Sequence, residues 1–554
     1  MSSKSNGKIQ RMIRPEALRK KERLLWATGS GIDVWNLFCA CITGDLKAVK
    51  RLLKKDPSLA RTHYNYRTPL YFAVRENQVA VAKYLLQYGA DPLSLAVNDS
   101  LLDICRDRGY AELEQLLAEN FARKKGASPK GEPVAAAIRA HDLAKVKSLL
   151  DAEPELLHAG DAQGNQPIHW AVMTRQPDVV DELLARGADI NAARFDRARP
   201  IQLTNGDYNF RGWRDVPADW PVTPAQVLEH LRHRGAYVDI NTAASIGDQK
   251  RVKQLLKQDP SLANKTSDYV TYYVGSGAPL KNAAARGHIE IVKLLLKYGA
   301  DPNLPEEGIA PRGHALYSAV YNRHYEIAKL LLEHGAYPSP PVESSADALS
   351  IALSNGDEKM VELLCSYGSA REVHLLAYYG DLQTAAAVFA ANPALSNDPE
   401  ALAIAAGNGH ESFVRLMLRY QPDLPKRTTF PGWLVGAKTR ALNELLFEHG
   451  LNPSYPDWLG ITPLHQFARK GEVEKARWFI AHGADLHARD EDICSTPLGW
   501  AAKFGQMEMV KLLLKHGAKT NLEDDPKWAT PLQWALRRGH GKIARLLKKH
   551  GAVS

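Results

Sequence analysis

The sequence predicts an all-α solenoid of short, stacked helix-turn-helix units, and three observations predict it. Thr-Pro-Leu recurs in the last third of the chain, each time 34 residues after the previous copy, at Thr462, Thr496 and Thr530. Glycines placed to end a second helix keep nearly the same step, at positions 450, 483, 517 and 551. The residues between these markers form short apolar stretches that suit helices. A fixed period of this length is typical of repeat architectures.

The unit that opens at Thr496 shows why such a segment forms two helices. Thr496 is suited to cap the first helix, and Pro497 fits its first turn, where a missing N–H costs nothing. Gly505 permits the turn between the helices, and residues 507–514 supply the apolar face of the second helix. Gly517 is placed to end that helix. Because neither helix buries its face alone, stacked units make one elongated core.

The period of about 33 residues, the T-P-L-H start, the central glycine and the closing Gly-Ala-Asp together resemble the ankyrin repeat. The same signature opens at residues 68–70, 166–169 and 278–280, and it closes at residues 89–91, 187–191 and 299–303. Degenerate copies fill the gaps, giving about sixteen repeats from Val34 to the C-terminus. The resemblance implies a curved ankyrin-repeat solenoid whose first helices and projecting turn or β-hairpin fingers line a concave side.

A longer periodicity groups the repeats into larger blocks. An Asp, a basic or polar helix and then an acid or Asn followed by Pro recur with the Asp at positions 45, 142, 248 and 381. We expect a basic flexible N-terminal segment (1–33), a first block (34–123), a linker or enlarged finger (124–132), a second block with an insertion at 204–220 (133–237), a third block (238–370) and a fourth block with the C-terminal cap (371–554).

The composition is that of an ordinary globular protein. Hydrophobic residues make up 45% and charged residues 24% of the 554 positions, which excludes a disordered or collagen-like chain. No apolar run approaches the ~20 residues that cross a bilayer, and no secretory apolar segment opens the chain, so we expect a cytoplasmic protein. Scattered cysteines without a C-x-x-C pair predict buried thiols rather than disulfides or a zinc site, at Cys39, Cys41, Cys105, Cys365 and Cys494.

The net charge of +9 is concentrated at the two ends of the chain. Residues 1–24 hold eight Lys or Arg and two Glu, and residues 526–554 hold seven Lys or Arg and no acid. A nucleic-acid binder more often shows a basic stripe along its body. We interpret the basic ends as a soluble tail and the polar outer face of a terminal repeat. Contact of the tail with nucleic acid or an anionic membrane is the weaker interpretation.

Residues 204–220 are the strongest departure from the repeat. Gly187 and Gly235 are 48 residues apart, where the ankyrin period is about 33. The insertion gathers aromatic and charged side chains that suit a binding loop, among them Tyr208, Arg211, Trp213, Arg214 and Asp215. Such side chains bury large areas and offer directed hydrogen bonds. The alternative is that the rings only fold the insertion back onto the solenoid.

A second long finger, residues 267–277, follows in the next block. It carries three tyrosines, at Tyr269, Tyr272 and Tyr273. Because fingers in ankyrin proteins project toward the concave side, the insertion and this finger are expected to form one aromatic patch. Trp170 and Tyr317, from first helices, would extend its floor. Ordinary packing between repeats is the alternative interpretation of those two side chains.

The sequence offers no motif for catalysis. Most of its nineteen histidines occupy repeat positions, and the resemblance implies that His169 and His465, in the T-P-L-H position, are structural hydrogen-bonding residues. No H-E-x-x-H or G-x-S-x-G is present. We therefore expect no catalytic residue, no metal and no cofactor.

The function that these observations favour is a non-enzymatic scaffold that binds a protein partner through its concave groove and fingers. The alternative is a small-ligand or carbohydrate site, with or without a catalytic role, built by the 204–220 insertion. A deep pocket with convergent Asp207, Arg211 and Asp215 would favour the alternative, and an open groove would favour the scaffold. The identity of the partner and the oligomeric state stay open at this point.

Overall fold

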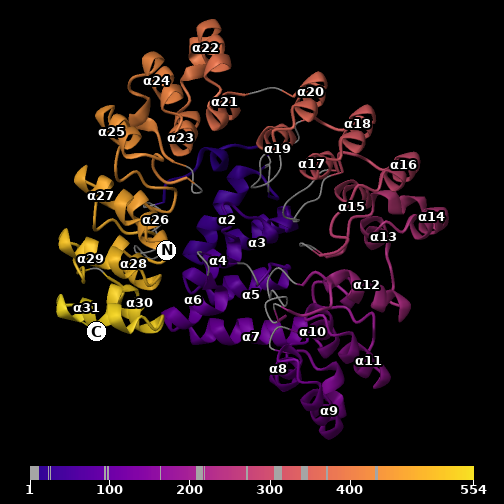
Figure 1. Cartoon of the computed structure of the whole chain (residues 1–554). Helices are drawn as coiled ribbons and strands as arrows, with labels where there is room; N and C mark the ends of the chain where they lie inside the picture. The colour runs from indigo at the N-terminus through magenta and orange to yellow at the C-terminus, as the bar shows by residue number, and fades with distance from the viewer. Residues whose placement is uncertain are drawn as a thin grey trace. The chain divides into compact units, whose positions relative to one another are not determined.

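Helices follow one another in pairs along the chain, which confirms the predicted all-α repeat solenoid (Figure 1). The computed structural model describes residues 12–22, 24, 27–92, 95–96, 99–161, 164–206, 216–217, 219–269, 273–304, 315–338, 347–369, 372–430, 434–523 and 525–553. Among these residues the strands are β1 (Leu95–Ala96) and β2 (Asp99–Ser100), which pair antiparallel with Leu95 opposite Ser100 and Ala96 opposite Asp99.

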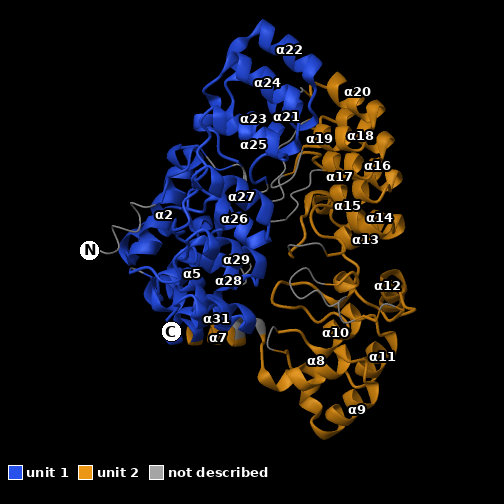
Figure 2. Cartoon of the chain, turned by 60° about the vertical axis from the view of Figure 1, so that its left-hand side comes forward, with its two compact units in different colours: residues 1–24, 28–114, 371–554 blue, residues 25–27, 115–370 orange. Residues whose placement is uncertain are grey.

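The chain divides into two compact units (Figure 2). Unit 1 holds residues 1–24, 28–114 and 371–554, so the first and last repeats belong to one body. Unit 2 holds residues 25–27 and 115–370. The linear order of the predicted blocks does not by itself place the first block with the fourth.

The helices of unit 1 come from both ends of the sequence. They are α2 (Gly31–Thr43), α3 (Leu46–Lys55), α4 (Pro69–Arg75), α5 (Val79–Gln87), α6 (Leu101–Arg108), α21 (Val373–Tyr379), α22 (Leu382–Ala391), α23 (Pro399–Asn408), α24 (Glu411–Tyr420), α25 (Arg440–Glu448), α26 (Pro463–Lys470), α27 (Val473–Ala481), α28 (Pro497–Lys503), α29 (Met507–Lys515), α30 (Pro531–Arg537) and α31 (Gly541–Lys549). Helix α7 (Ala111–Lys125) contains the division between the units.

Unit 2 continues the same pairing of helices. Its helices are α8 (Glu132–Arg139), α9 (Leu143–Ala152), α10 (Pro167–Met173), α11 (Pro177–Ala185), α12 (Pro224–His233), α13 (Ile240–Ile246), α14 (Gln249–Gln258), α15 (Pro279–Ala285), α16 (Ile289–Lys297), α17 (Ala315–Tyr321), α18 (Tyr325–Glu333), α19 (Ala348–Ser354) and α20 (Glu358–Ser366). In the two units together, short 3-10 helices lie at Glu16–Arg19, Pro57–Arg61, Pro129–Gly131, Pro154–His158, Pro200–Leu203, Pro260–Asn264, Pro393–Ser396, Leu424–Arg427 and Lys527–Ala529.

The repeat that opens at Thr496 folds as its sequence predicts. The Thr496 hydroxyl accepts the N–H of Gly499, and Pro497 occupies the first turn of α28. Gly505, at φ +74°, makes the turn into α29, and Gly517, at φ +89°, follows the end of α29. The buried face of α29 includes Val510 and Leu513, both fully buried. Successive first helices then stack on one another, as α26 on α28 and α28 on α30 do.

Three local features refine the expectations from the sequence. Within the N-terminal segment expected to be flexible, the Leu18 side chain is fully buried. In the segment expected to be a linker or an enlarged finger, the Ser128 N–H donates to the carbonyls of Gly160 and Asp161, both at 3.1 Å. The expectation of five buried thiols is confirmed for Cys41 and Cys105. It is wrong for Cys365, which is exposed on α20, while Cys39 and Cys494 are half-buried.

Candidate functional site

Most of the residues predicted for the aromatic patch lie outside the described part of the chain. Tyr208, Arg211, Trp213, Arg214 and Asp215 in the insertion, and Tyr272 in the second finger, are in this group. At the end of the insertion, the indole N–H of Trp220 donates to the carbonyl of Arg175 at 2.8 Å. The binding role of the insertion therefore stays a prediction.

The two described tyrosines of the second finger are buried within unit 2. The exposed fractions are 3% for Tyr269 and 5% for Tyr273, and both rings belong to the core of the second block. The Tyr269 hydroxyl donates to the carbonyl of Val274 at 3.2 Å, and the Tyr273 hydroxyl donates to Asp196 at 3.0 Å. Burial raises the pKa of Tyr269 well above its ordinary value. These rings hold the base of the finger, because both hydroxyls are bonded inside the fold.

Trp170 and Tyr317, predicted for the floor of the patch, are also buried. The Trp170 indole N–H donates to Asp161 at 2.7 Å, and the guanidinium of Arg139 lies 4.8 Å from the ring centre. The Tyr317 ring stacks on Tyr321, whose side chain is 59% exposed. Of this pair, Tyr321 is therefore the ring that offers free surface.

Unit 1 contains a different constellation, which begins with a finger at residues 489–495 between α27 and α28. Its organising residue is Asp490, which is 1% exposed. One oxygen of this carboxylate accepts the N–H groups of Asp492 and Ile493, both at 2.7 Å. The other accepts the N–H of Ser495 and the indole N–H of Trp500, at 3.1 and 2.9 Å. A buried carboxylate thus fixes the turn and points Asp492 away from its own repeat.

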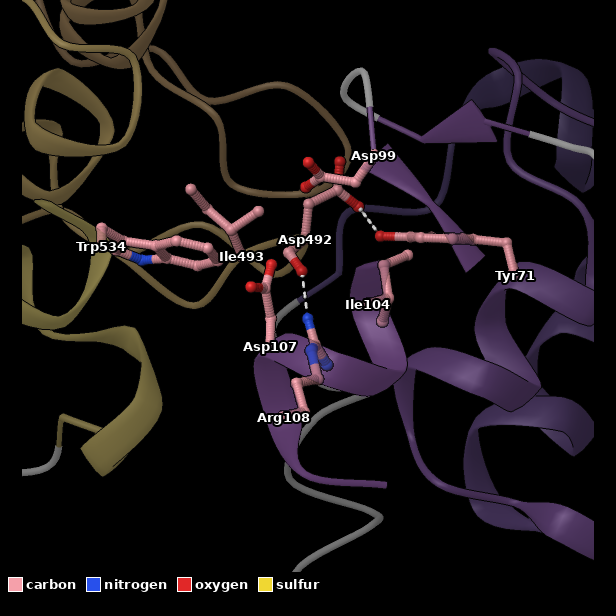
Figure 3. Close-up of a pocket in the computed structure, with 8 residues that line it drawn as sticks. All are labelled: Tyr71, Asp99, Ile104, Asp107, Arg108, Asp492, Ile493 and Trp534. Atoms are coloured by element: carbon pink, nitrogen blue, oxygen red, sulfur yellow. Dashed lines mark hydrogen bonds between the residues drawn. The ribbon is translucent and has the colours of Figure 1, made fainter. Parts of the chain in front are cut away.

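Asp492 lies against the first helices of the first block (Figure 3). Its carboxylate accepts hydrogen bonds from the Arg67 guanidinium and from the Tyr71 hydroxyl, the latter at 2.6 Å. The guanidinium of Arg75 donates to the carbonyl of Glu491 at 2.9 Å, and that of Arg108 donates to the carbonyl of Asp492 at 2.6 Å. We call Arg67, Tyr71, Arg75 and Arg108 the arginine cradle.

The electrostatics of the arginine cradle favour an ionised carboxylate. Burial alone would raise the pKa of Asp492, but the charge of Arg67 and the hydrogen bonds from Arg67 and Tyr71 hold it below its ordinary value. Burial and the Asp492 charge raise the pKa of Tyr71 well above its usual range, so this hydroxyl stays a donor. Among the described residues, Nε of Arg67 and Nη2 of Arg75 are buried without a hydrogen-bond partner. The cradle therefore holds more donors than the finger uses.

A second group of charges lies beside the cradle with the opposite polarity. Here the first block supplies the acids, Asp99 and Asp107, and the last repeats supply the bases. Lys503, 3% exposed at the end of α28, contacts Asp99 at 2.7 Å. Arg538, just after α30, makes two bonds to Asp107, at 2.9 and 2.6 Å. Because the cradle and this second group have opposite polarities, they fix one register between the first block and the last repeats.

A small cavity and several aromatic rings lie beside the contact between the 489–495 finger and the first block. A cavity of about 10 Å³, lined by Tyr71, Asp107, Ile493 and Trp534 among others, has the volume that one water molecule requires. Nearby, the ring of Trp458 in the preceding finger packs edge-on against Tyr64 and Phe72. The described residues therefore close the site around its own finger.

This constellation was not predicted from the sequence. Two signals were present: arginines at both ends of a short first helix, Arg67 and Arg75, and an acidic finger, Arg-Asp-Glu-Asp, at residues 489–492. The two arginines lie 416 and 425 residues before their partners in the finger, and no repeat period relates such separations. Among the described residues, no cluster of His, Cys, Asp and Glu is placed to hold a metal ion. In that part of the chain, no helix has the length and apolar character that a bilayer crossing requires.

The paired helices and the fingers between them define the class of the protein, a repeat solenoid. The family model "Ankyrin repeats (3 copies)" matches residues 23–95, 101–194, 240–342, 433–524 and 464–553. These matches cover more than half of the chain, and the chain belongs to the ankyrin-repeat family. Proteins of this family generally mediate protein–protein interaction.

Individual relatives match only part of the chain. The chain is 31% identical over 200 residues to an E3 ubiquitin-protein ligase of Arabidopsis thaliana, covering 32% of this chain and 38% of that protein. It is 27% identical over 168 residues to an ankyrin repeat protein of fowlpox virus (strain NVSL), covering 30% of this chain and 33% of the viral protein. The human transient receptor potential cation channel subfamily A member 1 is 23% identical over 221 residues, 40% of this chain and 16% of the channel. The chain thus spans less than two-fifths of these relatives.

Proposed function

We propose that this chain is a non-enzymatic scaffold that binds a protein partner through its fingers and concave groove. The observation that carries the proposal is the construction of the fingers. In unit 2, Asp161 accepts the backbone N–H of Asn165 and the indole N–H of Trp170, and Asp490 organises its finger in unit 1 in the same way. Fingers fixed before binding lose little conformational entropy when a partner docks, which favours affinity.

The partner surface that we propose lies in unit 2 and combines the 204–220 insertion with the 267–277 finger. Tyr208, Arg211, Trp213, Arg214, Asp215 and Tyr272 are its proposed contact residues. Tyr269 and Tyr273 support this surface from below, since they anchor the second finger in the core. Aromatic and Arg side chains concentrate binding energy in protein interfaces. Cytoplasmic location stays a prediction from the sequence.

Affinity purification from native lysate followed by mass spectrometry tests this surface. The bait is the full chain, compared with the Trp213→Ala and Tyr272→Ala variants and with a chain lacking residues 204–220. We expect a protein that is recovered with the full chain and depleted at least tenfold with either point variant, because hot-spot truncation commonly costs 2 kcal/mol or more. The melting temperature should stay unchanged.

Tyr337→Ala is the matched control, because Tyr337 is 63% exposed in unit 2 outside the proposed surface. It should recover the partner at the level of the unmodified chain. Equal recovery by all variants would contradict the proposed surface. A loss of binding that parallels a loss of thermal stability would mean that the aromatic residues only pack.

A further inference from the structure

The finger at residues 489–495 contacts the arginine cradle as a bound peptide contacts its receptor. Hydrogen bonds to one carboxylate and two backbone carbonyls hold it, and Ile493 lines a small cavity together with Tyr71 and Arg108. The Asp492 side chain is fully buried, and Ile493 beside it is 5% exposed. The arginine cradle therefore recognises a short acidic turn by its charge, its backbone and its shape.

The cradle is organised by the first block itself. Tyr71 and Arg75 are four residues apart on α4 and share one face of that helix. Arg108 links α6 to α4, because its guanidinium also donates to the carbonyl of Arg75 at 2.6 Å. The neighbouring Glu76 carboxylate accepts Nε of Arg75 at 2.8 Å. These bonds do not involve the finger, so they hold the receptor side in place without it.

The finger is organised independently of the cradle. The four bonds to the Asp490 carboxylate come from residues 492–500, all within its own repeat. The backbone N–H of Asp490 donates to the carbonyl of Ser495 at 3.3 Å, which brings the two ends of the turn together. Two preorganised surfaces of opposite charge can separate and rejoin without either one unfolding.

We propose that the arginine cradle is a receptor for acidic loops of partner proteins, and that the chain's own 489–495 finger is the resident ligand that such a loop displaces. This inference goes beyond the proposed function, because it concerns unit 1 and a different set of residues. It stands whether or not the aromatic surface of unit 2 binds a partner.

The cradle defines the chemistry of the partner loop. An aspartate must face Arg67 and Tyr71, because a neutral residue there would leave a buried guanidinium without its counter-charge. A branched apolar residue must follow it, in the place of Ile493. The spare donors, Nε of Arg67 and Nη2 of Arg75, favour a loop with a further acceptor. A basic segment is excluded by charge.

A peptide that copies the finger tests the receptor directly. The probe is a fluorescent peptide of residues 489–496, cyclised end to end because the ends of the turn are paired. Its binding is measured by fluorescence anisotropy on the full-length chain and on the full-length Asp492→Ala and Asp492→Asn variants. We expect the peptide to bind both variants at least tenfold more tightly than the unmodified chain, whose cradle is occupied.

Two matched controls isolate the charge recognition. A peptide in which Asp492 is replaced by Asn should bind the Asp492→Ala chain at least tenfold more weakly. Adding Arg67→Ala to the Asp492→Ala chain should abolish binding of the acidic peptide. Far-ultraviolet circular dichroism of each chain shows whether it has kept its helices.

A measurement on the unmodified chain covers the case in which the variants fail to fold. Excess peptide should displace the resident finger into solvent. Backbone hydrogen exchange at residues 489–495 should then rise, because the finger loses its packing against the cradle and its own bonds open more often, whereas the Asn peptide should leave the exchange unchanged. The proposal is overturned if a folded Asp492 variant does not bind the peptide or binds the Asn peptide equally well. With no folded variant, unchanged exchange in the unmodified chain overturns it.

Discussion

His169 uses both nitrogens of its imidazole to join two repeats. Nδ1 accepts the N–H of Gln166 at 3.0 Å, so it carries no proton, and Nε2 donates to the carbonyl of Ala192 at 2.8 Å. His465 makes the equivalent bonds with Thr462 and Ser495. Both imidazoles are fully buried. The structural role that the family resemblance implies for these two residues has a clear geometric basis, which requires the neutral ring.

A fall in pH should destabilise the protein through the buried imidazoles of His169 and His465. Burial lowers the pKa of His169 to about 4, whereas an unfolded chain titrates near its ordinary value of 6.5. The unfolded state therefore binds more protons, and stability falls as pH falls from about 6.5 toward 4. For His169 alone the loss is about 2 kcal/mol at pH 5. The measurement is the drop in melting temperature between pH 7.5 and pH 5.

His169→Gln removes the titrating group and should reduce that drop, although it lowers stability at pH 7.5. His158→Gln is the matched control, because His158 is exposed in the same unit. It should leave the drop unchanged. An equal drop in all three chains would show that His169 does not titrate with the stated pKa difference.

Residue-level prediction from the sequence was accurate where chemistry is local. The capping role of Thr496 and the turn at Gly505 follow from neighbouring residues, and both are confirmed. The floor of the aromatic patch was less predictable, because spacing places Trp170 in a first helix without showing that Asp161 accepts its indole N–H. The indole is consequently a structural donor, whatever its role in binding.

Between elements, a recurring contact of glycine with histidine joins adjacent repeats. Gly247 ends α13 with φ +81°, and a Cβ added there would lie 2.8 Å from the imidazole of His288 in the next repeat. Nε2 of His288 lies 3.3 Å from the carbonyl of Ser245. Gly380 meets His410 and Gly505 meets His540 in the same way. The glycine between the helices thus serves both the turn and the stacking.

Gly247→Ala should therefore cost more than the backbone strain alone. A left-handed alanine costs roughly 1–2 kcal/mol, and displacing His288 adds about 1 kcal/mol for the weakened bond to the next repeat. Gly299→Ala is the control, because Gly299 has φ +79° and no atom within 4 Å of an added Cβ. Urea unfolding followed by circular dichroism should show a larger loss in the free energy of unfolding for Gly247→Ala than for Gly299→Ala. Equal losses would mean that His288 moves aside at no cost.

At the scale of the whole molecule, periodicity predicts stacking of neighbours and nothing more distant. In a simple solenoid each repeat contacts only the repeats beside it. Unit 1 departs from that pattern, since Arg538 and Asp107 are 431 residues apart in the sequence and form a two-bond ion pair. Lys503 and Asp99 add a second pair across the same contact. The repeat fold could be predicted from its local signals, but this long-range contact could not, because its residues obey no common period.

The long-range contact should make the first repeats depend on the last. Arg538→Ala leaves the buried Asp107 without its two-bond partner, which should lower the local stability of α6 and the β1–β2 hairpin by about 1–2 kcal/mol. Backbone hydrogen exchange of residues 95–108 should then accelerate about 5- to 30-fold. Arg545→Ala, at an exposed position of α31, should leave that exchange unchanged. If Arg538→Ala accelerates exchange only in its own repeat, the ion pair between Arg538 and Asp107 does not stabilise the first repeats.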